Sequence, residues 1–126
     1  MSVKRGFKRI PVWSVLALMV LAPGAAFAHA FLDHADPAVG STLHRTPAQV
    51  KLWFSEPIEP AFSSLRVFDA RGSEIDKGDQ TVSSNDKTLL AVSVPNLPPG
   101  TYRVVWRVVS ADTHKTGGDF TFSIAP

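Results

Sequence analysis

The clearest strand candidate in the sequence is Thr101-Tyr-Arg-Val-Val-Trp-Arg-Val-Val109, in which every second residue from Tyr102 onward is apolar. Successive side chains of a β-strand point to opposite faces, so an alternating stretch of this length predicts a strand with one face in a core. One face would carry Tyr102, Val104, Trp106 and Val108, and the other Arg103, Val105, Arg107 and Val109. We expect the aromatic side chains of this strand to lie in the core and its two arginines to pair with surface acids.

Four shorter stretches share this character and are separated by Gly, Pro, Asn and Asp. They are residues 50–54, 65–68, 88–94 and 120–124. No helical period is sustained after the first thirty residues. Several short strands in a chain of this size predict an all-β fold, an antiparallel sandwich of immunoglobulin-like size. The polar residues 76–86 are expected to form an exposed loop or a weak edge strand.

The start of the chain has the three parts of a secretory signal. Residues 1–9 carry four cations and no acid, residues 10–21 are almost wholly apolar, and Ala26-Phe-Ala28 precedes a cut after Ala28. A membrane-spanning helix needs about 20 apolar residues, which is more than this run provides. We therefore expect residues 1–28 to be removed, leaving one domain, residues 29–126, in the periplasm and not embedded in the membrane. The export route, Sec or Tat, stays open.

Charge and cysteine content exclude two classes of site. Four of the thirteen Lys and Arg residues lie in the first nine positions, so residues 29–126 carry nine cations and eleven acids, a net formal charge of −2. Nucleic-acid binding is not expected, because it requires a basic surface. The chain has no cysteine, so it can form neither a disulfide nor a thiolate metal site.

Removal of the signal would make His29 the first residue. An N-terminal histidine can bind one metal through both its α-amine and its ring Nδ1, which an internal histidine cannot do. The reference pKa of an α-amine is about 7.7–8.0, so a metal displaces its proton at little cost near neutral pH.

Asp112 and His114 lie two residues apart near the other end of the chain, in Ser110-Ala-Asp-Thr-His-Lys-Thr-Gly-Gly118. In extended chain their side chains would leave the same face, and the Gly-Gly pair indicates a loop or strand end. If the N-terminal strand runs beside this segment, His29 meets both. Three nitrogens and one carboxylate oxygen suit Cu(II), with Zn(II) second, and protons would compete for every nitrogen at low pH.

Each of these features also has an ordinary interpretation. Asp-x-His is common in solvated loops, and a histidine after a signal can be accidental. His34 and His44 are read as surface residues, although a contribution of His34 to the site stays open.

Several blocks of the sequence together resemble the CopC/PcoC family of periplasmic copper-binding proteins. They are His29-Ala-Phe-Leu, Asp36-Pro-Ala-Val-Gly-Ser41, Val50-Lys-Leu-Trp-Phe-Ser-Glu-Pro57, Leu97-Pro-Pro-Gly-Thr-Tyr102 and the segment from Val105 to Gly118. The resemblance implies a Greek-key sandwich of about seven strands, immunoglobulin-like or cupredoxin-like. It also implies one Cu(II) ion per processed chain, held by His29, Asp112 and His114.

The same resemblance implies three further expectations. Glu56 would orient the amine or accept a hydrogen bond beside the ion. Family members that carry Cu(I) use methionines and a histidine, which residues 58–64 lack here, so we expect a Cu(II)-only member. A CopD-like inner-membrane copper transporter would be a partner, encoded as a separate chain.

The sequence thus predicts a non-enzymatic protein that buffers or delivers copper in homeostasis or resistance. Storage or transport, and resistance or uptake, stay open, as does the oligomeric state. The rival is a histidine-brace copper monooxygenase acting with O₂, which shares the N-terminal histidine. Asp112 argues against it, because it would fill the position that a reacting oxygen species needs. A purely structural sandwich is the third alternative, and it would bind no copper.

Overall fold

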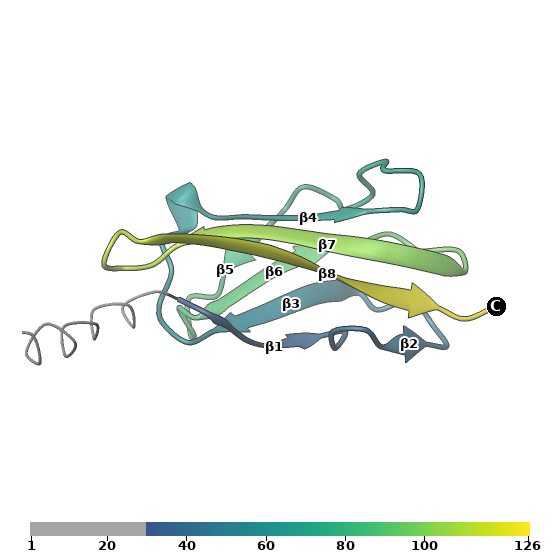
Figure 1. The fold of residues 1–126 in the computed structure, drawn as a ribbon, viewed down its shortest axis with the longest axis horizontal. Helices are drawn as coiled ribbons and strands as arrows, with labels where there is room; N and C mark the ends of the chain where they lie inside the picture. Colours follow the sequence, from purple (N-terminus) through teal and green to yellow (C-terminus); the bar gives the residue numbers. More distant parts are fainter. Residues whose placement is uncertain (1–29) are drawn as a thin grey trace, which may run out of the picture.

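The computed structural model describes residues 30–126, so His29 and the expected signal, residues 1–28, lie outside the described residues. Within residues 30–126 the chain forms two four-stranded sheets packed face to face (Figure 1). The first sheet has the order β1-β3-β6-β5 and the second the order β2-β8-β7-β4. The expected all-β sandwich is confirmed.

The strands are short except for β7 and β8. The first sheet contains β1 (Leu32–Asp36), β3 (Gln49–Phe54), β6 (Leu89–Ser93) and β5 (Thr81–Val82). The second contains β2 (Thr42–Leu43), β8 (Lys115–Ile124), β7 (Gly100–Val109) and β4 (Ser64–Phe68). A 3₁₀ turn, η2 (Pro60–Phe62), lies between β3 and β4. Among the residues that the structure describes, no helix has the length and apolar character needed to span a bilayer.

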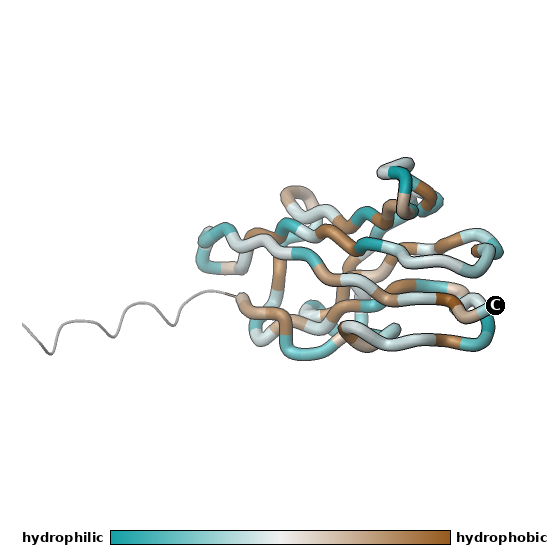
Figure 2. The backbone as a smooth tube through the Cα atoms, turned by 45° about the vertical axis from the view of Figure 1, so that its right-hand side comes forward, coloured by the Kyte–Doolittle hydropathy of each residue, from teal (hydrophilic) through white to brown (hydrophobic). Residues whose placement is uncertain are grey.

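Alternation along the strands builds the core between the sheets. Every second residue of β7 from Tyr102 onward is buried, and the expected face of Tyr102, Val104, Trp106 and Val108 points inward. The same change of hydropathy from residue to residue is visible along the strands in Figure 2. Aromatic contacts join the two layers: the rings of Phe54 on β3 and Trp106 on β7 meet edge to face at 5.1 Å.

Four details differ from the sequence-based expectation or refine it. Residues 30–126 form eight strands, because Thr42 and Leu43 add the short β2. This strand pairs in parallel with β8, while all other strand pairs in the described part of the chain are antiparallel. β8 begins at Lys115, before the expected start at residue 120. The polar stretch 76–86 does contain a weak edge strand, β5.

The early start of β8 follows from the role of Gly118, which was expected in a loop or at a strand end. Gly118 is the cross-strand partner of Trp106, and a Cβ atom there would come 2.8 Å from Cζ2 of the indole. Glycine in a strand often marks such a close approach. The residue makes room for the Trp106 ring and leaves the strand unbroken.

Candidate metal centre

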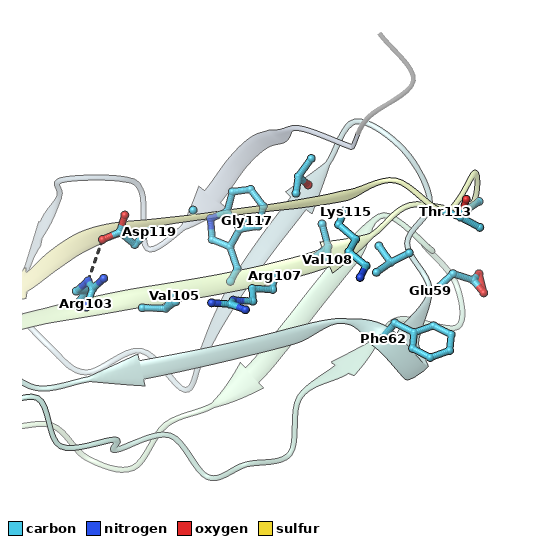
Figure 3. Close-up of a pocket in the computed structure, with 15 residues that line it drawn as sticks. Glu59, Phe62, Arg103, Val105, Arg107, Val108, Thr113, Lys115, Gly117 and Asp119 are labelled. Atoms are coloured by element: carbon cyan, nitrogen blue, oxygen red, sulfur yellow. Dashed lines mark hydrogen bonds and ion pairs between the residues drawn. The ribbon is translucent and has the colours of Figure 1, made fainter. Parts of the chain in front are cut away.

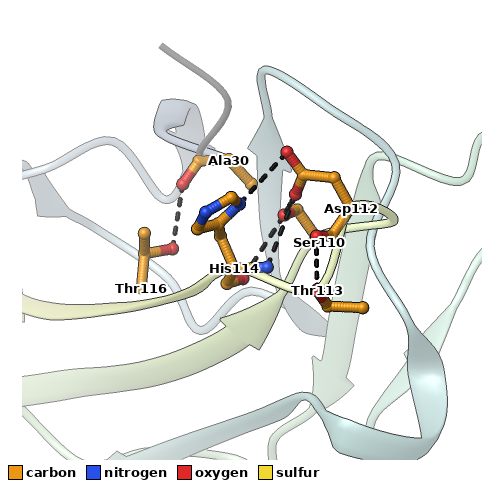
Figure 4. A network of polar contacts seen from close by, with 6 residues as sticks. All are labelled: Ala30, Ser110, Asp112, Thr113, His114 and Thr116. Atoms are coloured by element: carbon orange, nitrogen blue, oxygen red, sulfur yellow. Dashed lines mark hydrogen bonds and ion pairs between the residues drawn. The ribbon is translucent and has the colours of Figure 1, made fainter. Parts of the chain in front are cut away.

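Asp112 and His114 lie together in the tight loop that joins β7 to β8 (Figure 4). Their facing atoms, Asp112 Oδ2 and His114 Nδ1, are 3.2 Å apart. The two side chains are 38% and 48% exposed respectively, so an ion from solvent can reach both. The expected convergence of these two residues is therefore present in the structure.

The loop backbone is held in one conformation by hydrogen bonds across it. The Ser110 amide donates to the His114 carbonyl at 2.9 Å, and the Thr113 amide donates to the Ser110 carbonyl at 2.8 Å. Thr113 has a φ of 72°, which is unusual for a β-branched residue. Backbone conformations of this kind persist where the surroundings hold them, and they cluster at functional sites.

Ser110 stabilises the charged form of the Asp112 carboxylate. Its buried hydroxyl donates a hydrogen bond to Asp112 Oδ1, and this contact lowers the pKa of the Asp112 carboxyl below its ordinary value. Hydrogen bonds from the side chain and amide of His114 lower the same pKa further, partly offset by desolvation. These contacts favour the charged form of the carboxylate, which is the form that binds a metal.

The N-terminal segment of the described chain runs beside this loop. Ala30 is fully buried, and its carbonyl accepts a hydrogen bond of 2.9 Å from the hydroxyl of Thr116, two residues after His114 (Figure 4). Phe31 is fixed from the other side, because its amide donates to Ser55 Oγ at 2.8 Å and its carbonyl accepts from the Ser55 amide at 2.8 Å. The residue that adjoins position 29 is thereby held next to the strand that begins at the loop.

Glu56 lies near the same region, in the turn after β3. Its neighbour Ser55 binds Phe31, and the carbonyl of its other neighbour, Pro57, accepts a hydrogen bond of 3.0 Å from the Ala111 amide. Glu56 is half-buried. Its turn therefore connects the N-terminal segment to the Asp112–His114 loop.

Two histidines considered from the sequence lie elsewhere. His34 on β1 stacks on the ring of Trp53, with centroids 4.4 Å apart, and its Nδ1 is 2.8 Å from Asp33 Oδ2. His44 is exposed in the loop after β2. Within residues 30–126, no group of three or more His, Asp or Glu side chains could hold a metal ion. A site with three protein ligands thus requires a donor in addition to Asp112 and His114.

The donors present fit a small divalent ion. Metal–nitrogen and metal–oxygen bonds of about 2.0–2.2 Å at a right angle place neighbouring ligand atoms about 3 Å apart. The 3.2 Å between His114 Nδ1 and Asp112 Oδ2 is close to that separation. One ion bound to both His114 Nδ1 and Asp112 Oδ2 would therefore replace the direct contact between these two atoms with little movement of either side chain.

Sequence reasoning missed the polar residues that support the site: Ser110, Thr116 and Ser55. Each lies next to a residue or motif that was identified, but Ser and Thr are common at strand ends, and their local sequence does not reveal what they bind. The three-dimensional structure is needed to see that the Thr116 hydroxyl binds the Ala30 carbonyl and that the Ser110 hydroxyl binds the side chain of Asp112.

Comparison with known protein families and sequences gives a consistent result. Residues 32–125 match the CopC domain family. The chain is 35% identical over 112 residues to Protein YobA of Escherichia coli K12, covering 88% of this chain and 90% of that protein. It is 32% identical over 124 residues to Copper resistance protein C of Xanthomonas campestris pv. juglandis, covering 94% of this chain and 97% of the relative.

A third relative is much longer. The Copper transport protein CutJ of Bacillus subtilis is 35% identical over 119 residues, which are 93% of this chain but 22% of CutJ. The chain therefore spans less than a quarter of that protein, and the remainder of CutJ has no counterpart in this comparison.

Two solved structures share the fold and a related sequence. CopC from Methylosinus trichosporium OB3b superposes with a TM-score of 0.73 and 33% identity, covering 78% of this chain and 95% of that structure. PcoC, described as a methionine-rich copper resistance protein from Escherichia coli, gives 0.69 and 30%, covering 77% and 99%.

Proposed function

Because this chain belongs to the CopC domain family, we propose that it is a copper-binding protein that buffers or delivers Cu(II) in copper homeostasis or resistance. The relatives named for a function are copper transport and copper resistance proteins. The loop with two suitable donors supports copper as the ligand.

One observation carries the proposed site: the hydrogen bond from Thr116 to the carbonyl of Ala30. It anchors the residue after position 29 beside the loop that holds Asp112 and His114. If the signal is cut after Ala28, the new α-amine and the imidazole of His29 are one residue away from this anchor. The proposed ligands are then the amine and ring of His29, the imidazole of His114 and the carboxylate of Asp112.

The donor set accounts for the choice of metal. Three nitrogens and one oxygen in a tetragonal arrangement suit Cu(II), and the Irving–Williams order places Cu(II) above Ni(II) and Zn(II) for such ligands. The charge of Asp112 partly neutralises the ion. We propose one ion per processed chain, with Glu56 beside the amine as a hydrogen-bond acceptor.

The setting of the function is part of the proposal. A basic start, an apolar run and Ala26-Phe-Ala28 support export and cleavage, which would leave the processed protein in the periplasm. A separate CopD-like inner-membrane transporter would then exchange copper with it. No observation on residues 30–126 specifically favours the copper monooxygenase, and we propose a carrier without enzymatic activity.

Electron paramagnetic resonance of the processed protein loaded with one equivalent of Cu(II) tests the proposed site. The His114→Ala variant should lose one equatorial nitrogen and so change the copper hyperfine and nitrogen couplings. His44→Ala, which removes an exposed histidine outside the site, is the matched control and should leave the spectrum unchanged. Identical spectra for the His114 variant and the unaltered protein would refute this ligand assignment.

A second sample examines the role of the free amine. Protein that retains one extra residue before His29 offers an amide nitrogen in place of the amine. Its affinity for Cu(II), measured by competition with a chromophoric chelator, should fall by orders of magnitude, because the chelate ring is lost. Unchanged affinity would exclude the N-terminal chelate. Turnover with ascorbate and O₂, measured on the same preparation, would instead support the monooxygenase.

A further inference from the structure

A groove runs along the outer face of the second sheet, starting at the proposed copper loop. It has a volume of about 1010 Å³ and lies over β7 and β8, with η2 at one end (Figure 3). Ala111 and Thr113 of the copper loop line it, and Arg103 and Asp119 lie toward the other end. A molecule bound in this groove would therefore contact the copper loop.

Arg107 and the glycine opposite it, Gly117, both line the groove. Arg107 on β7 has Ser64 of β4 and Gly117 of β8 as its cross-strand partners. A Cβ atom on Gly117 would lie 3.5 Å from Cγ of Arg107, so the arginine side chain passes over the space that glycine leaves open. Glycine in a strand is often found where another chain or ligand approaches closely.

The lining of the groove alternates between apolar and cationic groups. Outward positions of β7 read Arg103, Val105, Arg107 and Val109 along the strand. Phe62 on η2 adds an aromatic ring that is 71% exposed. The turn that carries this ring is held in place, since the Glu59 amide donates to the Val109 carbonyl at 2.8 Å and the Ser63 hydroxyl donates to the Glu59 carbonyl at 2.8 Å.

The charge of the groove is opposite to that of the domain. Residues 30–126 carry a net formal charge of −2, whereas the groove is lined by three cations and two acids. One of those acids, Asp119, is bound to Arg103 Nε at 2.8 Å, as expected for a surface arginine. The same expectation fails for Arg107, because among the described residues no salt bridge involves it or Lys115. Both are exposed, and together they form the local positive charge.

We propose that this groove is a docking site for an extended segment of a partner protein that presents acidic and apolar side chains in turn along one face, at every second position. The spacing supports this occupant, because side chains on one face of an extended peptide recur every second residue, as do the valines and arginines of β7. Carboxylates would bind the guanidinium of Arg107 and the ammonium of Lys115, and the apolar side chains would cover Val105 and Phe62.

The inference rests on the proposed function in one respect: the partner that docks here is the one that exchanges copper with the loop. A flat anionic membrane fits the observations less well, because the cationic groups line a concave groove that also contains apolar residues. Binding in the groove would bring the partner's copper ligands next to Asp112 and His114.

Titration of the ¹⁵N-labelled, metal-free processed protein tests the proposal, because paramagnetic Cu(II) would broaden the amide signals beside the loop. The probe is a short extended peptide in which aspartate and phenylalanine alternate at every second position, with serine between them. Amide shifts should be confined to β7, β8 and η2 and should weaken as salt is added. A peptide with lysine in place of aspartate is the control. Vesicles of phosphatidylglycerol and phosphatidylcholine in equal parts form a separate arm. Binding of the vesicles without binding of the acidic peptide would overturn the proposal.

Two variants with a matched control sharpen the result. Arg107→Glu should weaken peptide binding about tenfold or more, because it places like charges together. Phe62→Ser should weaken it through loss of apolar contact. Arg71→Glu reverses an exposed cation that lies near Gly100, at the start of β7 far from the copper loop, and should leave binding unchanged. Equal loss in all three variants, or none in Arg107→Glu, would refute the docking site.

The copper affinity of each sample separates this inference from the proposed function. Copper binding without peptide binding would contradict the docking site alone. Peptide binding by a protein that binds no copper would contradict the proposed function and leave the docking site supported.

Discussion

Ser110 is the buried residue on which the Asp112 carboxylate depends. Its hydroxyl donates to Asp112 Oδ1 and is the main cause of the lowered pKa of that carboxyl. A lowered pKa means that the carboxylate stabilises the loop at neutral pH, and that this stabilisation is lost as the pH falls through the pKa of the folded state. Ser110 therefore favours the charged form of a proposed metal ligand and extends to lower pH the range in which it is ionised.

We predict that Ser110→Ala raises the pKa of Asp112 in the metal-free protein toward its ordinary value, because the main hydrogen bond to the charged form is removed. A pH titration of the ¹³C carboxyl shift measures this. Thr88→Val provides the matched control, since the Thr88 hydroxyl lowers the pKa of Asp86 in the same way. Each variant should move its own carboxyl only. An unmoved Asp112 in Ser110→Ala would show that the hydroxyl does not act on it.

Thr116 binds the backbone of the N-terminal segment and not a proposed ligand side chain. The carbonyl that it binds belongs to Ala30, a fully buried residue, so loss of the donor would leave that carbonyl without its Thr116 partner. An unpaired buried polar group costs about 1–3 kcal/mol.

We predict that Thr116→Val weakens Cu(II) affinity about tenfold. Loss of the hydrogen bond would destabilise the position of Ala30, and with it the conformation in which residue 29 lies beside the loop. Competition with a chromophoric chelator measures the change. Thr121→Val removes a hydroxyl from an exposed position of the same strand and should leave affinity as it was. Equal affinities for the two variants would argue that residue 116 does not position the amine.

Among the elements, the β7–β8 hairpin determines where the site is. Its ten residue pairs run from Gly100↔Ile124 to Val109↔Lys115, and the loop with Asp112 and His114 closes it. Regular pairing along the hairpin requires a glycine at position 118, opposite Trp106, because the indole ring lies where a side chain of residue 118 would be. The position of the loop and the packing of the core are therefore coupled through this pair.

We predict that Gly118→Ala destabilises the domain by about 1–3 kcal/mol, because the added Cβ overlaps the Trp106 ring. Chemical denaturation followed by circular dichroism measures the loss. The Trp106→Phe variant lacks the indole atom nearest to that Cβ, so in a double-mutant cycle Gly118→Ala should cost less in that background than in the unaltered protein. Additive effects of the two substitutions would exclude the proposed steric conflict.

Across the entire domain, the two sheets bring the N-terminal segment and the β7–β8 loop to one end. Ala30 and Thr116 are 86 residues apart in sequence and in direct contact. A metal bound between these segments would connect the N-terminal segment to the β7–β8 loop and stabilise the folded state, because the unfolded chain cannot present the same ligands together.

We predict that saturating Cu(II) raises the Tm of the processed protein by about 10 °C at neutral pH, given that a ligand at 100 times its Kd contributes about 2.7 kcal/mol. The increase should shrink as the pH falls below the amine pKa of about 7.7–8.0, because protons compete for the nitrogen ligands. Thermal unfolding with and without copper at several pH values measures it. Protein with one extra residue before His29 should show a much smaller increase. A pH-independent increase would contradict nitrogen ligation.

Local patterns in the sequence were enough for the class of fold and for the proximity of two of the three proposed ligand residues. Alternation in residues 101–109 predicted which face of β7 is buried, because the two-residue period of a strand is a property of the backbone itself. Asp112 and His114 were placed together by the same period, but in the structure they meet through a tight turn in which Thr113 has a positive φ, and the strand period does not predict that turn. The chelating role of His29 was inferred from the cleavage signal and stays a prediction, since that residue lies outside the described part of the chain.

Contacts between distant segments depend on how the complete fold packs. No local period indicates that Thr116 holds Ala30, that β2 pairs in parallel with β8, or that Gly118 admits the Trp106 ring. The groove likewise brings together Arg107 of β7, Gly117 of β8 and Phe62 of η2, which belong to three separate elements. The side-chain period sets the face that a residue occupies, whereas strand order and register arise from the packing of both sheets around one core.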